Sequence, residues 1–320
     1  MTILVLESRM SACPSAFVLY TVRHHSFTHS SFTCEKIRDK HKSLSCGSNE
    51  IWRSPLRSDA SNARTSWPQI SPRENRVQLR KAWTNPAQLI LRALPNTETL
   101  WLIERSYIFL KVFDVNGRSA VIRLSDGTLF IHAPLALTPD LKAALDKLGE
   151  VSIVATPNSE HCDFVAQWKY FYPKAKYLAC PALSKRRQDL PFDGELSTDN
   201  TPDASYADDI EQIFIKAVPF FNEVLFYHKQ SRSLLVTDVF WNFPEGKDIP
   251  TGTSAFRWMM NRIYKPVYER ILVRDRKQFE DSMQKVLEKD IQRIIPCHGY
   301  IIENGAKTWM TEFFSSLLRT

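Results

Sequence analysis

The chain has 320 residues, of which 43% are hydrophobic and 24% are charged, which is enough apolar material for a globular core. Its net charge is +7, but residues 1–70 hold nine Lys and Arg against five Asp and Glu, so the other 250 residues are nearly neutral at 33 against 30. A nucleic-acid-binding domain concentrates basic charge on its folded body, and this distribution argues against one. The longest apolar stretch, 256–273, is interrupted by Pro266 and five charged residues, so we expect no transmembrane segment.

Residues 1–75 differ in composition from the rest of the chain. The first seventy contain thirteen Ser, scattered basic residues and few acids, which is typical of an organellar transit peptide. The alternative is a disordered tail without an address. Glu7 and Arg9 split the early apolar segments, which argues against a secretory signal. We predict a disordered transit peptide over 1–75, a linker over 76–96 and one domain over 97–320.

The first part of the predicted domain alternates between short strands and turns. We expect strands over 101–104, 107–113, 121–124 and 128–132. Asn116-Gly117 and Asp126-Gly127 are typical hairpin turns, because these residues tolerate positive φ. An antiparallel meander is therefore predicted for this region.

Helices and strands then alternate. Thr138-Pro139-Asp140 predicts the start of a helix that Gly149 closes, because Thr caps helices and Pro fits the first turn. We expect strands over 151–156 and 176–179 on either side of a helix over 160–172, and a surface loop over 185–208. Beyond it the predicted elements are strands over 210–217, 222–228, 233–237 and 293–296, and helices over 254–273, with a break near Pro266, 276–289 and 306–318.

Three of the predicted strands end close to a residue that can bind a metal. His161, preceded by Glu160, follows the strand over 151–156, Asp238 follows the strand over 233–237, and His298 follows the strand over 293–296. Side chains just beyond the carboxyl ends of strands commonly converge in α/β proteins. Two imidazoles with one or two carboxylates suit zinc, iron or manganese. The sequence therefore predicts a degraded or single-metal site, with Glu160, His161, Asp238 and His298 as candidate ligands.

This order of elements, with Val236-Thr237-Asp238 and Pro296-Cys297-His298-Gly299, resembles the metallo-β-lactamase-like hydrolase superfamily over about residues 97–320. More narrowly it resembles an uncharacterised plastid and cyanobacterial branch, a domain of unknown function. The resemblance implies an α/β fold, a four-layered αββα sandwich. It also implies localisation in the plastid, with the mitochondrion as the second choice.

The superfamily signature His-x-His-x-Asp-His is altered in this chain. Thr156, Asn158, Glu160 and His161 stand at its four places, so the first two histidines are missing. A further histidine, expected before the strand over 222–228, is replaced by the stretch 219–221. The resemblance thus implies that the ligands of a first metal are lost, while Glu160, His161, Asp238 and His298 remain for a second.

Neighbouring residues allow further readings. His132 stands where the superfamily usually has an aspartate near the site, and we favour a hydrogen-bonding role beneath the site over a ligand role. Cys162 and Cys297 adjoin the two candidate ligand histidines, so they are conceivable thiolate ligands or redox partners. Free buried cysteine is common, and we favour a structural role.

Two functions follow from the resemblance. In the first, the chain is a metal-dependent hydrolase of a small ester, thioester or phosphoester, in which the metal activates water and Asp238 orients it or acts as base. In the second, hydrolysis is lost and the fold serves as a binding or assembly module, with or without a metal. A small-molecule substrate belongs to the first reading only, and the sequence identifies no protein partner.

Overall fold

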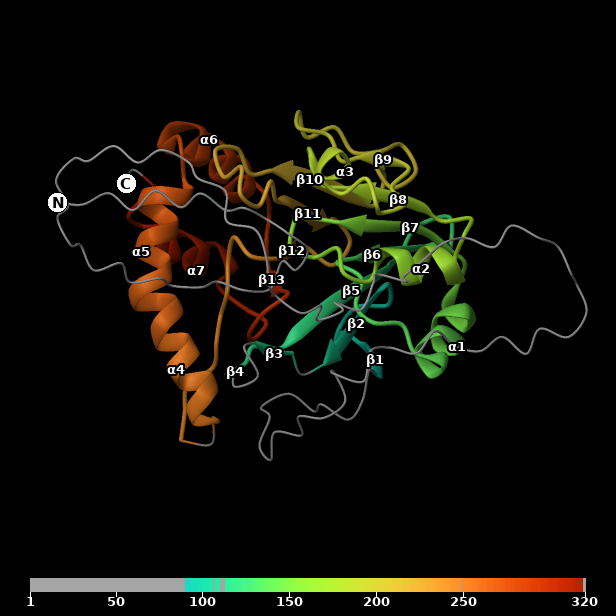
Figure 1. Ribbon diagram of the computed structural model, residues 1–320, viewed down its shortest axis with the longest axis horizontal. Helices are drawn as coiled ribbons and strands as arrows, with labels where there is room; N and C mark the ends of the chain where they lie inside the picture. Colours follow the sequence, from blue (N-terminus) through green and yellow to red (C-terminus); the bar gives the residue numbers. More distant parts are fainter. Residues whose placement is uncertain (1–89, 106, 110–112, 248, 319–320) are drawn as a thin grey trace, which may run out of the picture. The chain divides into compact units, whose positions relative to one another are not determined.

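The computed structural model describes residues 90–318, except 106, 110–112 and 248 (Figure 1). The predicted transit peptide, 1–75, lies outside the described residues. Of the predicted linker, 76–96, only the end is described, and its residues 90–93 form strand β1. No helix among the described residues has both the length and the apolar character needed to cross a bilayer.

The first sheet has seven strands. In spatial order they are β1 (Ile90–Ala93), β2 (Leu100–Arg105), β5 (Gly117–Arg123), β6 (Leu129–His132), β7 (Val151–Thr156), β8 (Lys176–Ala179) and β9 (Gly194–Glu195). Pairing is antiparallel from β1 to β6 and parallel from β6 to β9. The predicted meander and the βαβ alternation that follows it are both present in this sheet.

One predicted turn in the meander is wrong. Instead of closing a hairpin, Gly117 begins β5 and pairs with Arg105 at the end of β2. The strand expected over 107–113 is broken into a small hairpin of β3 (Ile108–Phe109) and β4 (Phe113–Asp114), because the β2–β5 ladder already uses the flanking residues. The Asp126-Gly127 turn is confirmed: Gly127 has φ +85°, and the Leu124 N–H donates to the Thr128 carbonyl at 2.8 Å.

The second sheet has four strands and carries two of the strand ends that matter for function. In order they are β10 (Ile210–Phe214), β11 (Val224–His228), β12 (Ser233–Val236) and β13 (Arg293–Pro296). The pairs β10–β11 and β11–β12 are antiparallel, whereas β12–β13 is parallel. Because β12 and β13 are parallel neighbours, the residues that follow them leave the sheet at the same edge.

The shorter helices are α1 (Pro139–Leu148), α2 (Val165–Phe171), α3 (Leu183–Arg186), α6 (Arg276–Leu287) and α7 (Ala306–Phe313). Helix α1 starts as predicted, with the Thr138 hydroxyl accepting the Leu141 N–H at 3.2 Å. Helix α2 is shorter than the predicted 160–172. Its expected first turn is replaced by a turn in which the Asn158 side-chain oxygen Oδ1 accepts the N–H groups of Glu160 and His161.

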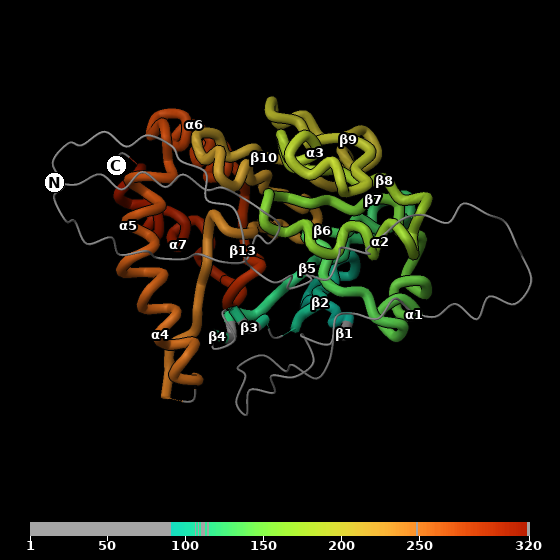
Figure 2. The backbone as a smooth tube through the Cα atoms, in the orientation of Figure 1, coloured from blue at the N-terminus to red at the C-terminus, as the bar shows by residue number. Residues whose placement is uncertain are grey.

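A long helical segment runs from 251 to 272, visible as one continuous coil in Figure 2. It consists of α4 (Thr251–Met259), the π-helical turn η1 (Met260–Tyr264), α5 (Lys265–Val267) and a second π-helical turn, η2 (Tyr268–Leu272). The predicted break near Pro266 is wrong. The wide turns on both sides of Pro266 give its ring space that a regular α-helix lacks, so the helix continues.

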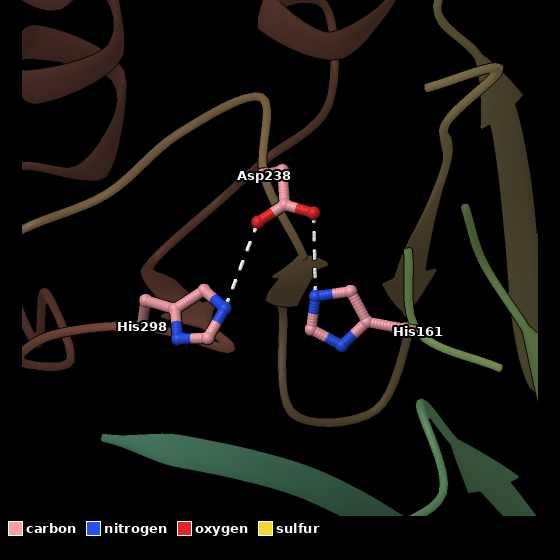
Figure 3. Close-up of side chains that lie close together, drawn as sticks. All are labelled: His161, Asp238 and His298. Atoms are coloured by element: carbon pink, nitrogen blue, oxygen red, sulfur yellow. Dashed lines mark ion pairs between the residues drawn. The ribbon is translucent and has the colours of Figure 1, made fainter. Parts of the chain in front are cut away.

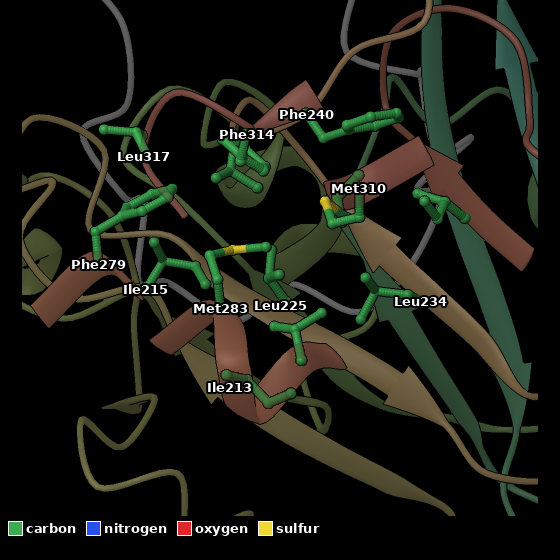
Figure 4. Close-up of a cluster of buried hydrophobic side chains, with 14 of the residues drawn as sticks. Ile213, Ile215, Leu225, Leu234, Phe240, Phe279, Met283, Met310, Phe314 and Leu317 are labelled. Atoms are coloured by element: carbon green, nitrogen blue, oxygen red, sulfur yellow. The ribbon is translucent and has the colours of Figure 1, made fainter. Parts of the chain in front are cut away.

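The two sheets and the helices form four layers. A core of residues from both sheets, including Phe130, Ile153, Phe226 and Ile295, lies between the sheets. The other face of the second sheet packs on α6 and α7 through a second core (Figure 4). Helices α1 and α2 cover the first sheet, on the side of the molecule away from α6 and α7 (Figure 1). The predicted αββα sandwich is confirmed.

Candidate metal centre

Three side chains from three strand ends meet at one point. His161 follows β7 by way of the 157–161 turn, Asp238 follows β12, and His298 follows β13. Among the described residues, these three form the group that could hold a metal ion, with their donor atoms within 4.8 Å of one another. Asp238 lies between the two imidazoles (Figure 3), with Oδ2 3.3 Å from His161 Nε2 and Oδ1 3.6 Å from His298 Nε2.

The spacing of these donors is close to that around a small divalent ion. Metal–ligand bonds of about 2.1 Å in a tetrahedron place neighbouring donors about 3.4 Å apart. The two imidazole nitrogens lie 3.3 and 3.6 Å from different oxygens of Asp238, and the three donors lie within 4.8 Å of one another, so a bound ion would draw them closer together. The three side chains are 15–20% exposed, so the group is reachable from solvent. The donor set and spacing therefore suit zinc, iron or manganese held by His161, Asp238 and His298.

The tautomer of His298 is fixed by the chain itself. Its Nδ1 lies 2.6 Å from the Asn116 carbonyl oxygen, to which a ring N–H at that position donates. Nε2 then carries the lone pair and points toward Asp238, the arrangement that metal-ligating histidines adopt. The interaction joins residues 182 positions apart, so no local sequence pattern predicts it.

Charges in the group are coupled. Burial alone would raise the pKa of Asp238, but attraction to His161 and His298 and the hydrogen bonds it accepts bring it to about 2. Burial opposes protonation of His161, yet the Asp238 carboxylate outweighs it and raises the pKa of His161. For His298 burial prevails and the pKa is lowered. Asp238 is therefore ionised at neutral pH, as a metal ligand must be.

Glu160, the fourth predicted ligand, stands beside the group without belonging to it. Its pKa is raised to about 7, first by burial and then by repulsion from Asp238. The three-residue donor group does not include it. Its role as a ligand stays a prediction.

Asn158, at a position where the resemblance predicts a histidine, has its own role. Its Nδ2 donates to Asp238 Oδ2 at 2.6 Å, while its Oδ1 accepts the N–H groups of Glu160 and His161, each at 3.1 Å. The same side chain thus orients Asp238 and shapes the turn that carries His161. The altered signature pointed to a lost ligand here, but its spacing gave no hint of the bond to Asp238.

Glu223 was not predicted, yet it positions Asp238 from below. This buried carboxylate, 2% exposed, accepts the backbone N–H groups of Thr237, Asp238 and Val239 at 2.7–2.9 Å. Burial and the Asp238 charge raise the pKa of Glu223 to about 7. The sequence signal that could have identified Glu223 is an acidic residue immediately before the apolar strand β11. It lies in the region where the resemblance predicts a third histidine.

The loop that carries His298 is held on both sides. On one side, the buried Arg118 donates to the Pro296 carbonyl and forms an ion pair with Glu104 at 2.7 Å. On the other, Gly299 bridges to Asn242 at φ +92°, and a Cβ on it would lie 2.3 Å from the Asn242 carbonyl oxygen. Only glycine allows this approach.

The remaining residues singled out in the sequence contribute no donor to the group. His132 is buried, and burial lowers its pKa to about 3, so its ring is neutral; its Nε2 has no hydrogen-bond partner among the described residues, so the predicted hydrogen-bonding role is not seen at that atom. Burial raises the pKa of Cys162 to about 11 and that of Cys297 far above its usual range, so both are neutral thiols. Phe221, in the stretch that replaces the third histidine, contacts the 157–161 turn by accepting the Ser159 N–H at 3.0 Å.

Comparisons with known proteins agree with this architecture. Residues 97–253 match the model of a family described as a domain of unknown function (DUF4336). No curated protein matches the chain by sequence.

Solved structures show the fold. A metallo-β-lactamase from Pontibacter korlensis has a TM-score of 0.51 at 11% identity, covering 72% of this chain and 99% of its own. The flavodiiron protein from Giardia intestinalis scores 0.53 at 11% identity, covering 73% of this chain and 60% of its own. The flavodiiron core Flv1 from Synechocystis sp. PCC6803 scores 0.52 at 12% identity, covering 71% of this chain and 60% of its own. This chain therefore has the metallo-β-lactamase fold.

Proposed function

We propose that this chain is a one-metal hydrolase that cleaves a small ester, thioester or phosphoester. The observation that carries the proposal is the convergence of His161 Nε2, Asp238 and His298 Nε2 at spacings that suit a divalent ion. The three side chains come from different strand ends and remain partly open to solvent, as a reactive centre requires.

The residues would divide the work as follows. His161, Asp238 and His298 would hold the metal, with Asp238 also orienting the attacking water. A divalent ion at this position supplies Lewis acidity toward a carbonyl or phosphoryl oxygen and acidifies a water. Asn158 and Glu223 would keep Asp238 in place through its side chain and its backbone N–H.

A second candidate function, a binding or assembly module without turnover, is favoured by one observation. The Asn158 amide already donates to Asp238 Oδ2, the oxygen nearest His161, and no imidazole stands at positions 156, 158 or 219–221. Both candidates therefore assume at most one metal. The two candidates differ in whether the remaining site turns over a substrate.

The test is a hydrolysis screen of the full chain supplied separately with zinc, manganese and iron(II). Aryl esters, acyl thioesters and aryl phosphoesters are the substrates, and release of the phenol or thiol is the readout. We expect the parent chain to hydrolyse one of these three substrate classes. In Asp238→Asn the hydrolysis rate should fall at least about a hundredfold, because a proposed metal ligand is lost. The exposed Asp208→Asn serves as the matched control and should keep full activity. Metal binding without turnover in any class would favour the second candidate.

A further inference from the structure

The helical segment 251–272 has two unlike outer rows. Alternating α and π turns give it about four residues per turn, so residues four apart line up along it. Phe256, Tyr264 and Tyr268 belong to the inward row and are wholly or partly buried in the cores around Trp241 and Phe279.

The row next to the inward one is apolar and largely exposed. Ile263 is 47% exposed, Val267 38% and Ile271 54%. These three are among eight large hydrophobic side chains exposed in the described part of the chain, and here they stand in line. Aligned apolar side chains on one helix are a surface that an apolar partner can cover.

The row that faces outward is basic. It runs through Trp258, Arg262 and Arg270, and Arg274 follows just beyond the end of the helix at Leu272; all four are exposed. Neither of these two outer rows contains an acid between 254 and 274. Within the described residues the three arginines form no ion pair, whereas the flanking Arg257 and Lys265 pair with Glu245 and Glu269.

From this arrangement we propose that the segment 251–274 lies on an anionic membrane surface. An apolar row beside a row of arginines, with an exposed tryptophan at one end, has the chemistry of a helix lying in the lipid headgroup region. The apolar row would enter the acyl boundary, and the arginines would contact lipid phosphates. Charge complementarity decides the occupant: a second copy of this face would bring arginines against arginines.

The attachment would be peripheral. The segment is too charged to cross a bilayer, and its inward row is already committed to the protein core. The proposal does not depend on the metal centre or its activity, because it uses none of those residues.

The experiment is flotation of the full chain with vesicles. One set contains about one part phosphatidylglycerol to three parts phosphatidylcholine, and the other contains phosphatidylcholine alone. The charge variant is Arg262→Gln with Arg270→Gln and Arg274→Gln, and the apolar variant is Ile263→Ser with Val267→Ser and Ile271→Ser. The matched charge control replaces Lys174, Lys185 and Lys285 with Gln, since these exposed lysines lie on other elements.

We expect the parent chain and the lysine control to float with the anionic vesicles and not with the neutral ones. Each of the two helix variants should lose at least about tenfold in partitioning, while circular dichroism shows that it remains folded. Using the full chain throughout keeps any contribution of residues 1–89 constant.

Two results would overturn the proposal. One is that the parent chain does not float with anionic vesicles. If the apolar variant in that case changes the oligomeric mass, the face is a protein contact instead. The other is that the charge variant and the apolar variant both float as well as the parent chain, which would place the membrane contact elsewhere.

Discussion

At the scale of single residues, Asp238 is the centre of the site. Each of its oxygens faces a different imidazole, one oxygen also accepts the Asn158 amide, and its backbone N–H donates to Glu223. Four long-range interactions thus hold Asp238 in place, in addition to its position after β12. Such support determines ligand geometry and affinity as much as the ligands do.

Replacing Asn158 tests this support. In Asn158→Ala, Asp238 loses a donor and the turn carrying His161 loses its acceptor, so we expect zinc affinity to fall about 10- to 100-fold. Competition with a chromophoric chelator measures it. Asn304→Ala, at an exposed asparagine, is the control. Equal affinities for the two variants would mean that Asn158 does not position the site.

Replacing Glu223 tests the buried acceptor. In Glu223→Gln, one of the oxygens that receive the three backbone N–H groups becomes an NH₂ group, so donors face donors. We expect the free energy of unfolding to fall by about 1–3 kcal/mol, measured by urea denaturation. Glu288→Gln, at an exposed site, should change it little. A stable Glu223→Gln protein would show that the carboxylate is not needed there.

At the scale of elements, the loop after β13 depends on a close approach. Gly299 combines a positive φ with backbone contact to Asn242, and the Tyr300 N–H donates to the Asn242 carbonyl at 2.7 Å. This contact fastens the loop carrying His298 to the segment that follows Asp238. The relative placement of two candidate ligands therefore rests on a residue without a side chain.

Two glycine substitutions separate the close approach from the backbone conformation. Gly299→Ala puts a Cβ into the Asn242 carbonyl, whereas Gly127→Ala, also at positive φ, meets nothing within 4 Å. We expect Gly127→Ala to cost about 1 kcal/mol and Gly299→Ala clearly more, with weaker zinc binding in Gly299→Ala alone. Thermal unfolding and zinc titration measure both. Identical losses in the two variants would contradict the account.

Local sequence signals predicted helices and strands correctly where no long-range contact competed with them. The strands over 176–179 and 293–296 and the Thr138 cap are found where the sequence placed them. The three strand-end residues of the candidate metal centre were also predicted from the sequence, and the structure brings them together. Glu223, Asn116 and Arg118 were missed because their partners lie 14 to 182 residues away in the chain. The helix over 254–273 was predicted, but its continuity through Pro266 was missed because the π-helical turns on both sides of the proline leave no local sequence signal.

At the scale of the whole molecule, burial of a neutral histidine makes stability depend on pH. His228, fully buried at the end of β11, has its pKa lowered to about 4 by burial, although the Asp209 charge opposes this. Above pH 6.5 the ring is neutral whether the chain is folded or unfolded. Below pH 6.5 the His228 imidazole takes up a proton in the unfolded chain but stays neutral in the folded chain, so the free energy of unfolding falls.

We therefore predict a loss of stability between about pH 6.5 and pH 4, with His228 contributing up to about 3 kcal/mol. Urea midpoints at several pH values measure the loss. In His228→Asn, which keeps a polar partner for Ser231, the slope over this range should be shallower, whatever its stability at pH 7.5. Parallel curves for parent and variant would exclude His228 as the source.

The measurement that tests the central claim most directly is metal content. The full chain, Asp238→Ala, His298→Ala and the Asp208→Asn control would be purified in parallel and analysed by plasma mass spectrometry. We predict about one equivalent of zinc, iron or manganese in the parent and the control, and its loss in both alanine variants while they remain folded. A folded parent that contains no metal and binds none when it is supplied would contradict the account.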